Sequence, residues 1–272
     1  MAHPIRTLLL GTAIALPLVL STTASAASSS SEKALLERIE KLEKRVQRLD
    51  DVDAITKLTR IYGYYVDKQL WDQVVDLFSD DCVIEIAGRG IYNGKKGASS
   101  LFLGSMGQGE IGLKPGSLFN HMILQGVVDV DSNGTTAQAR WRAFVQIAQY
   151  QKIALWSEGT YENTYVKQGG IWKLSGMHFY ATYYTPFDQG WAKASLPNNG
   201  PSKANPPDAP QSVTYDVFPG HYVPPFHYPN PVTGRPWTIE DSRKYSTSGM
   251  SPAPLSPPGG PPPAAPATPN SR

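Results

Sequence analysis

The chain has 272 residues, a formal net charge of +2, 40% hydrophobic residues and a single cysteine. A nearly balanced charge gives no electrostatic reason to expect nucleic acid or an anionic membrane as a partner. A lone cysteine excludes an intrachain disulfide, so packing has to hold the fold together. Cys82 opens the apolar run 82–84, which is typical of a buried strand rather than of a catalytic thiol.

The first 26 residues have the pattern of a secretory signal peptide. Arg6 precedes an apolar run over 8–20, and Ala24-Ser25-Ala26 resembles a cleavage site. An uncleaved membrane anchor is disfavoured, because the run contains Pro17 and is short for the ~20 residues of a bilayer span. The pattern predicts cleavage after Ala26 and a secreted or periplasmic protein.

Residues 27–50 predict a polar linker and an amphipathic helical arm. Its apolar residues recur with spacings of four and three among many charges, at Leu35, Ile39, Leu42, Val46 and Leu49. Two interpretations are open. The arm docks on its own domain, or it joins copies of the chain.

Residues 51–191 have the periodicities of one folded domain. Asp51 or Asp53 can cap the first helix of that domain. Asn133-Gly134 is a strong hairpin signal, because a type I′ turn needs positive φ at both central residues. The expected elements are helices at 51–67, 71–78 and 97–103, strands at 82–87, 91–92, 121–130, 135–150, 155–167 and 171–184, and a glycine-rich loop at 104–116. Long consecutive hairpins predict an α+β fold with a curled antiparallel sheet covered by N-terminal helices.

Residues 192–246 are rich in proline but also in aromatic side chains. This composition predicts an extended segment pinned on the surface of the domain or over its mouth. Residues 247–272 are a proline-rich stretch of low complexity, for which the composition predicts disorder.

Three motifs resemble the NTF2-like superfamily and, within it, the SnoaL-like subgroup that includes scytalone dehydratase and bile-acid 7α-dehydratase. They are the turn and strand Gly169-Gly170-Ile171-Trp172-Lys173-Leu174, the helical stretch 61–77, and Phe119-Asn120-His121-Met122. The likeness covers roughly residues 35–191 and implies an NTF2-like cone. Cones of this kind commonly pair through the outer face of the sheet, which implies a dimer or trimer.

The resemblance implies catalytic roles for Tyr62, Asp67 and His121, which stand where the bile-acid enzyme has its Tyr, Asp and His. It then breaks, because Gln146 cannot titrate where both enzymes have a second acid–base residue. The arginine of the last strand is also missing, since positions 180–181 are Tyr and Ala.

Such a set could dehydrate a hydroxy-carbonyl compound. An imidazole at His121 can take the α-proton and return it to the departing hydroxyl. A carboxylate at Asp67 would fix the imidazole tautomer, and the phenol of Tyr62 would steady the enolate. Tyr62 and Asp67 point ~140° apart on an ideal helix, so they share one pocket only if the helix loosens at its end.

Strand parity adds further candidates for contact with the substrate. Arg142 either faces inward as an oxyanion partner or outward in a salt bridge, and His178 either replaces the missing acid–base residue or is exposed. The predicted substrate-binding residues are Gln146, Arg142, Phe144, Tyr161, Trp141, His178 and Tyr180.

The sequence has no metal-ligand motif, phosphate-binding loop, dinucleotide fingerprint or Gly-x-Ser-x-Gly elbow, so no cofactor and no metal is expected. The sequence therefore predicts a cofactor-independent dehydratase for a hydrophobic polycyclic or aromatic hydroxy-carbonyl compound. An isomerase with the same residues, or a non-catalytic protein that binds an apolar ligand, are the alternatives.

Overall fold

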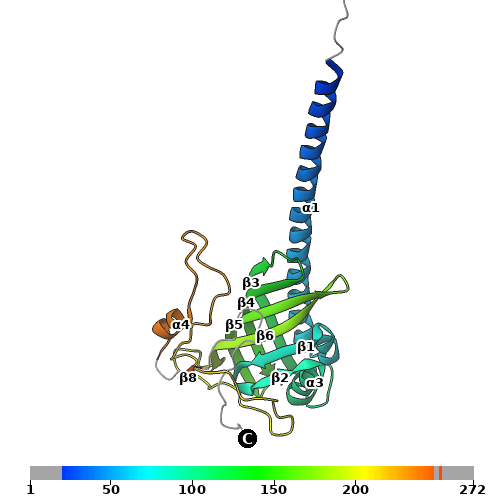
Figure 1. Cartoon of the computed structure of the whole chain (residues 1–272). Helices are drawn as coiled ribbons and strands as arrows, with labels where there is room; N and C mark the ends of the chain where they lie inside the picture. Colours follow the sequence, from blue (N-terminus) through cyan, green and yellow to red (C-terminus); the bar gives the residue numbers. More distant parts are fainter. Residues whose placement is uncertain (1–19, 248–250, 253–272) are drawn as a thin grey trace, which may run out of the picture. The chain divides into compact units, whose positions relative to one another are not determined.

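The computed structural model describes residues 20–247 and 251–252, with side chains over residues 30–247 (Figure 1). The predicted start of the signal peptide and most of the predicted disordered tail lie outside these residues. The chain divides into two compact units, one ending at Gln47 and the other beginning at Arg48. Among the described residues, no helix has the length and apolar character that a membrane span requires.

Helix α1 runs without interruption over Leu20–Asp67, so the arm and the first helix of the domain are one element. The prediction that Asp51 or Asp53 caps a new helix is therefore wrong. The Asp51 carboxylate instead accepts hydrogen bonds from the indole of Trp172 at 2.8 Å and from Lys167 at 2.7 Å. This buried contact ties the helix to the last hairpin and explains why a tryptophan follows the turn at Gly169-Gly170.

The helices and the short strands that follow come close to the predicted ones. They are α2 Trp71–Asp76, β1 Phe78–Ile86, the 3-10 turn η1 Ala87–Arg89, β2 Ile91–Asn93, α3 Gly94–Ser99 and the π-helix η2 Ser100–Met106. The π-helix occupies the start of the predicted glycine-rich loop. As predicted, Cys82 is buried in β1.

Four long strands make the rest of the sheet, namely β3 Ser117–Val130, β4 Thr136–Gln149, β5 Ile153–Gln168 and β6 Ile171–Pro186. The open six-stranded sheet has the order β2-β1-β6-β5-β4-β3. The α+β class is confirmed, but the sheet is not wholly antiparallel, because β1 pairs parallel with β6. The long connection between β2 and β3 permits that parallel pairing.

The inner face of the sheet packs against the helices. Along β4 every second residue from Ala137 to Val145 is buried, as expected for one face of a strand. These residues join one core with side chains of α1, α2 and η2, including Tyr62, Trp71 and Phe102. The domain therefore has a single apolar layer between helices and sheet.

The outer face of the sheet is covered in part by the C-terminal segment. Arg140 on β4 donates to the carbonyl oxygens of Pro224 at 3.0 Å and Pro225 at 2.8 Å, and its guanidinium lies 3.8 Å from the ring centre of Phe226. The same guanidinium is ion-paired with Glu162. These contacts hold the segment to the outer face of the sheet.

The C-terminal segment also contains two short strands and a helix that the sequence pattern did not predict. Strand β7 Val213–Thr214 pairs with β8 Ser251–Pro252, and α4 covers Ile239–Tyr245. Thr238 and Asp241 form a reciprocal capping box at the start of α4. That spacing of a hydroxyl and a carboxylate residue was the signal available in the sequence.

We predict that Arg140→Leu releases the segment. The change removes two backbone contacts and leaves the largely buried Glu162 without its guanidinium partner, which should lower the free energy of unfolding by about 2–4 kcal/mol. Urea titration measures the loss, and limited proteolysis should cut between residues 213 and 237 sooner. Arg142→Leu is the matched control for proteolysis, because the side chain of Arg142 bonds to Glu158 and Gln125 of the sheet rather than to the segment. This variant should be cut between residues 213 and 237 no faster than the parent protein, and equal rates of cutting in the two variants would contradict the prediction.

Candidate active site

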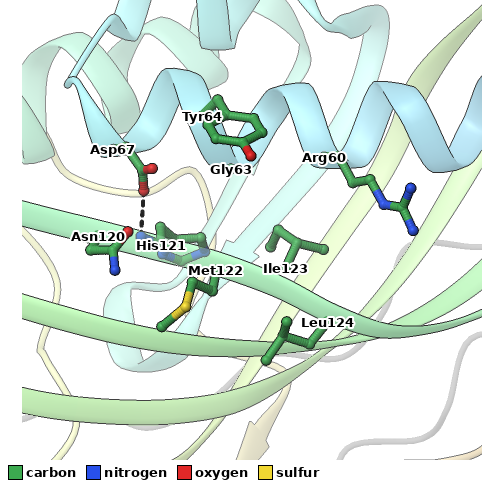
Figure 2. A pocket seen from close by; sticks show the side chains of 9 residues that line it. All are labelled: Arg60, Gly63, Tyr64, Asp67, Asn120, His121, Met122, Ile123 and Leu124. Carbon is green, nitrogen blue, oxygen red and sulfur yellow. Dashed lines mark hydrogen bonds between the residues drawn. The ribbon is translucent and has the colours of Figure 1, made fainter.

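His121 lies where the C-terminal end of α1 crosses edge strand β3 (Figure 2). The carboxylate of Asp67 accepts a short hydrogen bond from the backbone N–H of His121. One turn earlier on α1, Gly63 allows the approach, because a Cβ at this position would lie 2.9 Å from the carbonyl oxygen of His121. The helix therefore fixes the backbone of His121 from two sides.

The imidazole of His121 is part of a chain of polar groups inside the domain. Its Nε2 lies 3.0 Å from the hydroxyl of Tyr161, and that hydroxyl lies 3.2 Å from the hydroxyl of Tyr62. The imidazole Nδ1 is buried and has no hydrogen-bond partner among the described residues. A buried ring nitrogen without a partner is costly in a folded protein, and such groups are frequent at functional sites.

These polar groups line a cavity of about 90 Å³ between the helices and the inner face of the sheet. Most of the wall is apolar. The lining side chains are Tyr62, Val66, Ile86, Arg89, Met106, Phe119, His121, Val145, Ile147, Ser157, Tyr161, Phe179, Tyr184 and Asn199. This volume is smaller than the ~150 Å³ cavity that accepts benzene in a known case, so a ligand with an aromatic ring requires the wall to move.

Burial keeps the imidazole of His121 neutral, because it lowers the pKa of the ring to about 4. Burial likewise raises the pKa values of Tyr62 and Tyr161 above 10, so both phenols are neutral at pH 7. In the tautomer whose Nε2–H donates to Tyr161, the Nδ1 lone pair is free to accept a proton. The cavity thus combines a neutral base with two phenol donors.

Asp67 does not contact the imidazole, so the predicted carboxylate–imidazole pair is wrong. The five-residue separation from Tyr62 decides this, because α1 stays helical through Asp67 and the two side chains diverge. Tyr62 lines the inner cavity, whereas Asp67 lines a separate open groove of about 460 Å³ between α1 and β3. Asp67 positions His121 through its backbone instead.

The predicted contacts from β4 point elsewhere. Val145 and Ile147 face the cavity, so their neighbours Phe144 and Gln146 have the opposite parity and face outward. Phe144 packs on Trp156, and Gln146 accepts a hydrogen bond from Asn120. Two further candidates are also outside the cavity. Arg142 forms the outward ion pair with Glu158, and Trp141 is inward but donates to Tyr165 at 3.0 Å in the core.

His178 and Tyr180 on β6 lie on the outer face, because Phe179 between them faces the cavity. Neither alternative given for His178 is correct, since it is neither in the cavity nor exposed. It stacks on Tyr180 with 3.7 Å between ring centres, and Tyr180 packs under Tyr215 and Tyr222 of the C-terminal segment. Burial lowers the pKa of His178 well below its usual value.

Four polar residues of the cavity were not predicted from the sequence, namely Arg89, Ser157, Tyr184 and Asn199, and two of them come from outside the long strands. Arg89 comes from η1, where it stands between two glycines and looks like part of a turn. Asn199 belongs to the C-terminal segment, so that segment reaches the rim of the cavity as well as the outer face. The sequence around Arg89 and Asn199 has no helix or strand period that would predict an inward side chain at either position. Over the described residues, no cluster of three or more His, Cys, Asp or Glu side chains could hold a metal ion.

Part of the chain is similar to a known family of domains. Residues 47–178 match the family model of the SnoaL-like domain. This stretch, just under half of the chain, is therefore similar to the SnoaL-like domains of the NTF2-like superfamily. No protein of curated function matches the sequence.

Several solved structures are similar to the same part of the chain. A scytalone dehydratase-like protein from Novosphingobium aromaticivorans is 19% identical, with 58% of this chain and 97% of that chain covered and a TM-score of 0.46. A type 2 hexachlorocyclohexane dehydrochlorinase, LinA, is 21% identical over 53% of this chain and 93% of its own, with a TM-score of 0.45. Type 3 LinA from Novosphingobium barchaimii is 20% identical over 53% and 94%, with a TM-score of 0.45.

The buried imidazole predicts a loss of stability in acid. The pKa of His121 is about 4 in the folded chain and ~6.5 when unfolded, so between these values only the unfolded state is protonated. Stability should therefore fall as the pH drops from 6.5 towards 4. In His121→Gln, the difference in unfolding free energy between pH 7 and pH 4.5 should be about 2–3 kcal/mol smaller than in the parent protein. Urea titrations at both pH values measure it, and His178 contributes equally to both proteins. Parallel pH profiles would contradict the assignment.

Proposed function

We propose that this protein is a cofactor-independent lyase that dehydrates a hydrophobic hydroxy-carbonyl compound with an aromatic or polycyclic skeleton. The observation that carries the proposal is the neutral, buried imidazole of His121. It stands in the wall of an apolar cavity with one nitrogen on Tyr161 and the other unpartnered. The SnoaL-like family match supports a site inside the cone.

The reaction can be written with His121 as the only acid–base residue. Nδ1 takes the proton from the carbon next to the carbonyl, and the electron pair of that C–H bond forms the new C=C bond. The C–O bond on the adjacent carbon breaks, and the same imidazole returns its proton to the departing hydroxyl, which leaves as water. Because burial disfavours the imidazolium, we expect the proton to be passed on rather than held.

Tyr161 and Tyr62 have two roles in this scheme. Tyr161 orients the imidazole through Nε2, and Tyr62 holds the hydroxyl of Tyr161. A phenol of this pair can also donate to the carbonyl oxygen as negative charge develops on it. Donors already fixed in a cavity of low polarity stabilise such a charge more strongly than water does.

Two alternatives differ in what happens after the substrate binds. An isomerase would use the same proton transfer but return the proton to another carbon. A non-catalytic binding protein is favoured by Val145 and Ile147, because β4 presents only apolar side chains where the resemblance implies a second acid–base residue. The products separate the three, since dehydration loses one water, isomerisation keeps the mass, and binding alone changes nothing.

The test is turnover of a panel of aromatic and steroid-like β-hydroxy ketones, followed by the ultraviolet absorbance of the conjugated product and by its mass. His121→Gln should lower kcat by about 10²–10⁴-fold, and Tyr161→Phe by a smaller factor. Arg142→Gln, on the outer face, is the control and should keep its activity. Turnover by His121→Gln within threefold of the parent protein would exclude His121 as the acid–base residue.

A further inference from the structure

Among the described residues that line the cavity, Arg89 is the one charged side chain, because His121 is neutral, and it is half-buried. Its guanidinium makes only neutral contacts among the described residues, a long hydrogen bond of 3.4 Å from Nη1 to the carbonyl oxygen of Ile86 and a contact with the hydroxyl of Tyr184. None of the ion pairs among the described residues involves Arg89. A guanidinium beside apolar walls without a counter-ion is unfavourable, and a carboxylate is the partner that its planar fork fits best.

The position of Arg89 is fixed by its surroundings. Gly90, the next residue, has φ +89° and lies so close to the C-terminal segment that a Cβ would be 2.6 Å from Pro207. The backbone of Ile91 then exchanges hydrogen bonds with Ala209 at 2.9 Å and with Asp208 at 2.8 Å. The backbone of the turn is therefore clamped from outside, which fixes the point on the cavity wall from which the Arg89 side chain extends.

The charge of Arg89 affects the pKa values of the phenols in the cavity. Burial raises the pKa values of Tyr161 and Tyr184, and the Arg89 charge opposes that rise in both. His121, Tyr161 and Arg89 thus border one space, with the base and the cation on its wall.

We infer that Arg89 binds a carboxylate of the ligand, so that the site selects an aromatic acid over the uncharged analogue. This inference rests on the proposed function, because it names the charge of the molecule on which His121 would act. Because the guanidinium is always charged, we expect its partner to be an anion that the ligand already carries when it binds. The alternative is that Arg89 stabilises only an enolate oxygen that forms during the reaction, and the test distinguishes these two roles.

The test uses benzoate and benzamide, which have the same ring and differ in charge, in calorimetric titrations of the full chain at pH 7. Benzoate should bind at least about tenfold more tightly than benzamide, as expected for a charge-assisted contact. Arg89→Gln should bring the two within about threefold while benzamide binding persists, which shows that the cavity is intact. Arg89→Lys should keep part of the preference.

Arg60→Gln is the matched control, because Arg60 lines the outer groove next to His121 rather than the cavity. Three outcomes would overturn the inference: no preference in the parent protein, a preference that survives Arg89→Gln, or one that is lost in Arg60→Gln. Binding of benzoate needs no turnover. An inactive protein that still selects benzoate through Arg89 would therefore refute the lyase and not the anion site.

A second inference rests on a separate feature, the arm of α1. Five apolar residues of the arm recur at heptad spacing and are each 50–61% exposed, namely Leu35, Ile39, Leu42, Val46 and Leu49. If Leu35 is a d position, Ile39 and Val46 fall at a and the leucines at d. Branched residues at a with leucine at d favour parallel two-stranded coiled coils.

The charges beside this stripe agree with the parallel arrangement. Arg38 and Arg45 fall at g, and Glu43 and Asp50 fall at the e positions that face them in a parallel partner. Both predicted pairs are of opposite sign. We propose that a second copy of this chain covers the stripe and that the protein is a parallel dimer through the arm.

Light scattering of the full chain should give the dimer mass, and Ile39→Lys with Val46→Lys should give the monomer. Glu40→Gln with Gln47→Lys adds the same charge at outward positions and should stay dimeric. Oxidised Ile39→Cys should cross-link to a covalent dimer, because equal positions meet only in the parallel pair. A monomeric parent protein, a trimer, or a dimer that survives the lysines would overturn this proposal.

Discussion

The site depends on the close contact between α1 and edge strand β3. An edge strand has unpaired backbone groups, and here the helix occupies them at His121, with Asp67 on its N–H and Gly63 against its carbonyl oxygen. Because the backbone is held on the helix side, the imidazole reaches inward to Tyr161. A larger residue at Gly63 or the loss of Asp67 would move the base without touching the cavity itself.

The chemistry of the cavity follows from its lack of a carboxylate. In a serine-hydrolase triad the acid stabilises the imidazolium, whereas here phenols surround a ring whose pKa is about 4. Such a base is weak alone, so the positive charge that forms on it has to be balanced by negative charge on the substrate in the same step. This requirement favours reactions in which a proton leaves one atom of the substrate and returns to another, as in dehydration and isomerisation. Hydrolysis would need an imidazolium that persists.

The sequence predicted the helices and long strands of the domain, but not the continuity of α1 or the elements of the C-terminal segment. Its candidates Tyr62, His121 and Tyr161 all line the cavity, because helix and strand periods are local and the family resemblance carried the rest. It was not sufficient for the face of β4 that points inward. A period of two groups Arg142, Phe144 and Gln146 correctly but does not say which side the helices cover. Arg89 was missed for another reason, since its inward position depends on contacts of its turn with residues 207–209, more than a hundred positions away.

The C-terminal segment gives this cone a property that the sheet and helices alone do not. It buries Tyr180 and clamps Arg140 on the outer face, and it reaches the cavity rim at Asn199. A second copy could pair through this part of the outer face only by displacing Pro224, Pro225 and Phe226 from the Arg140 guanidinium. Arg140, which is ion-paired with Glu162, would then lose its hydrogen bonds to the segment. The covered outer face therefore disfavours pairing through the sheet, which agrees with the proposed pairing through the exposed stripe of α1.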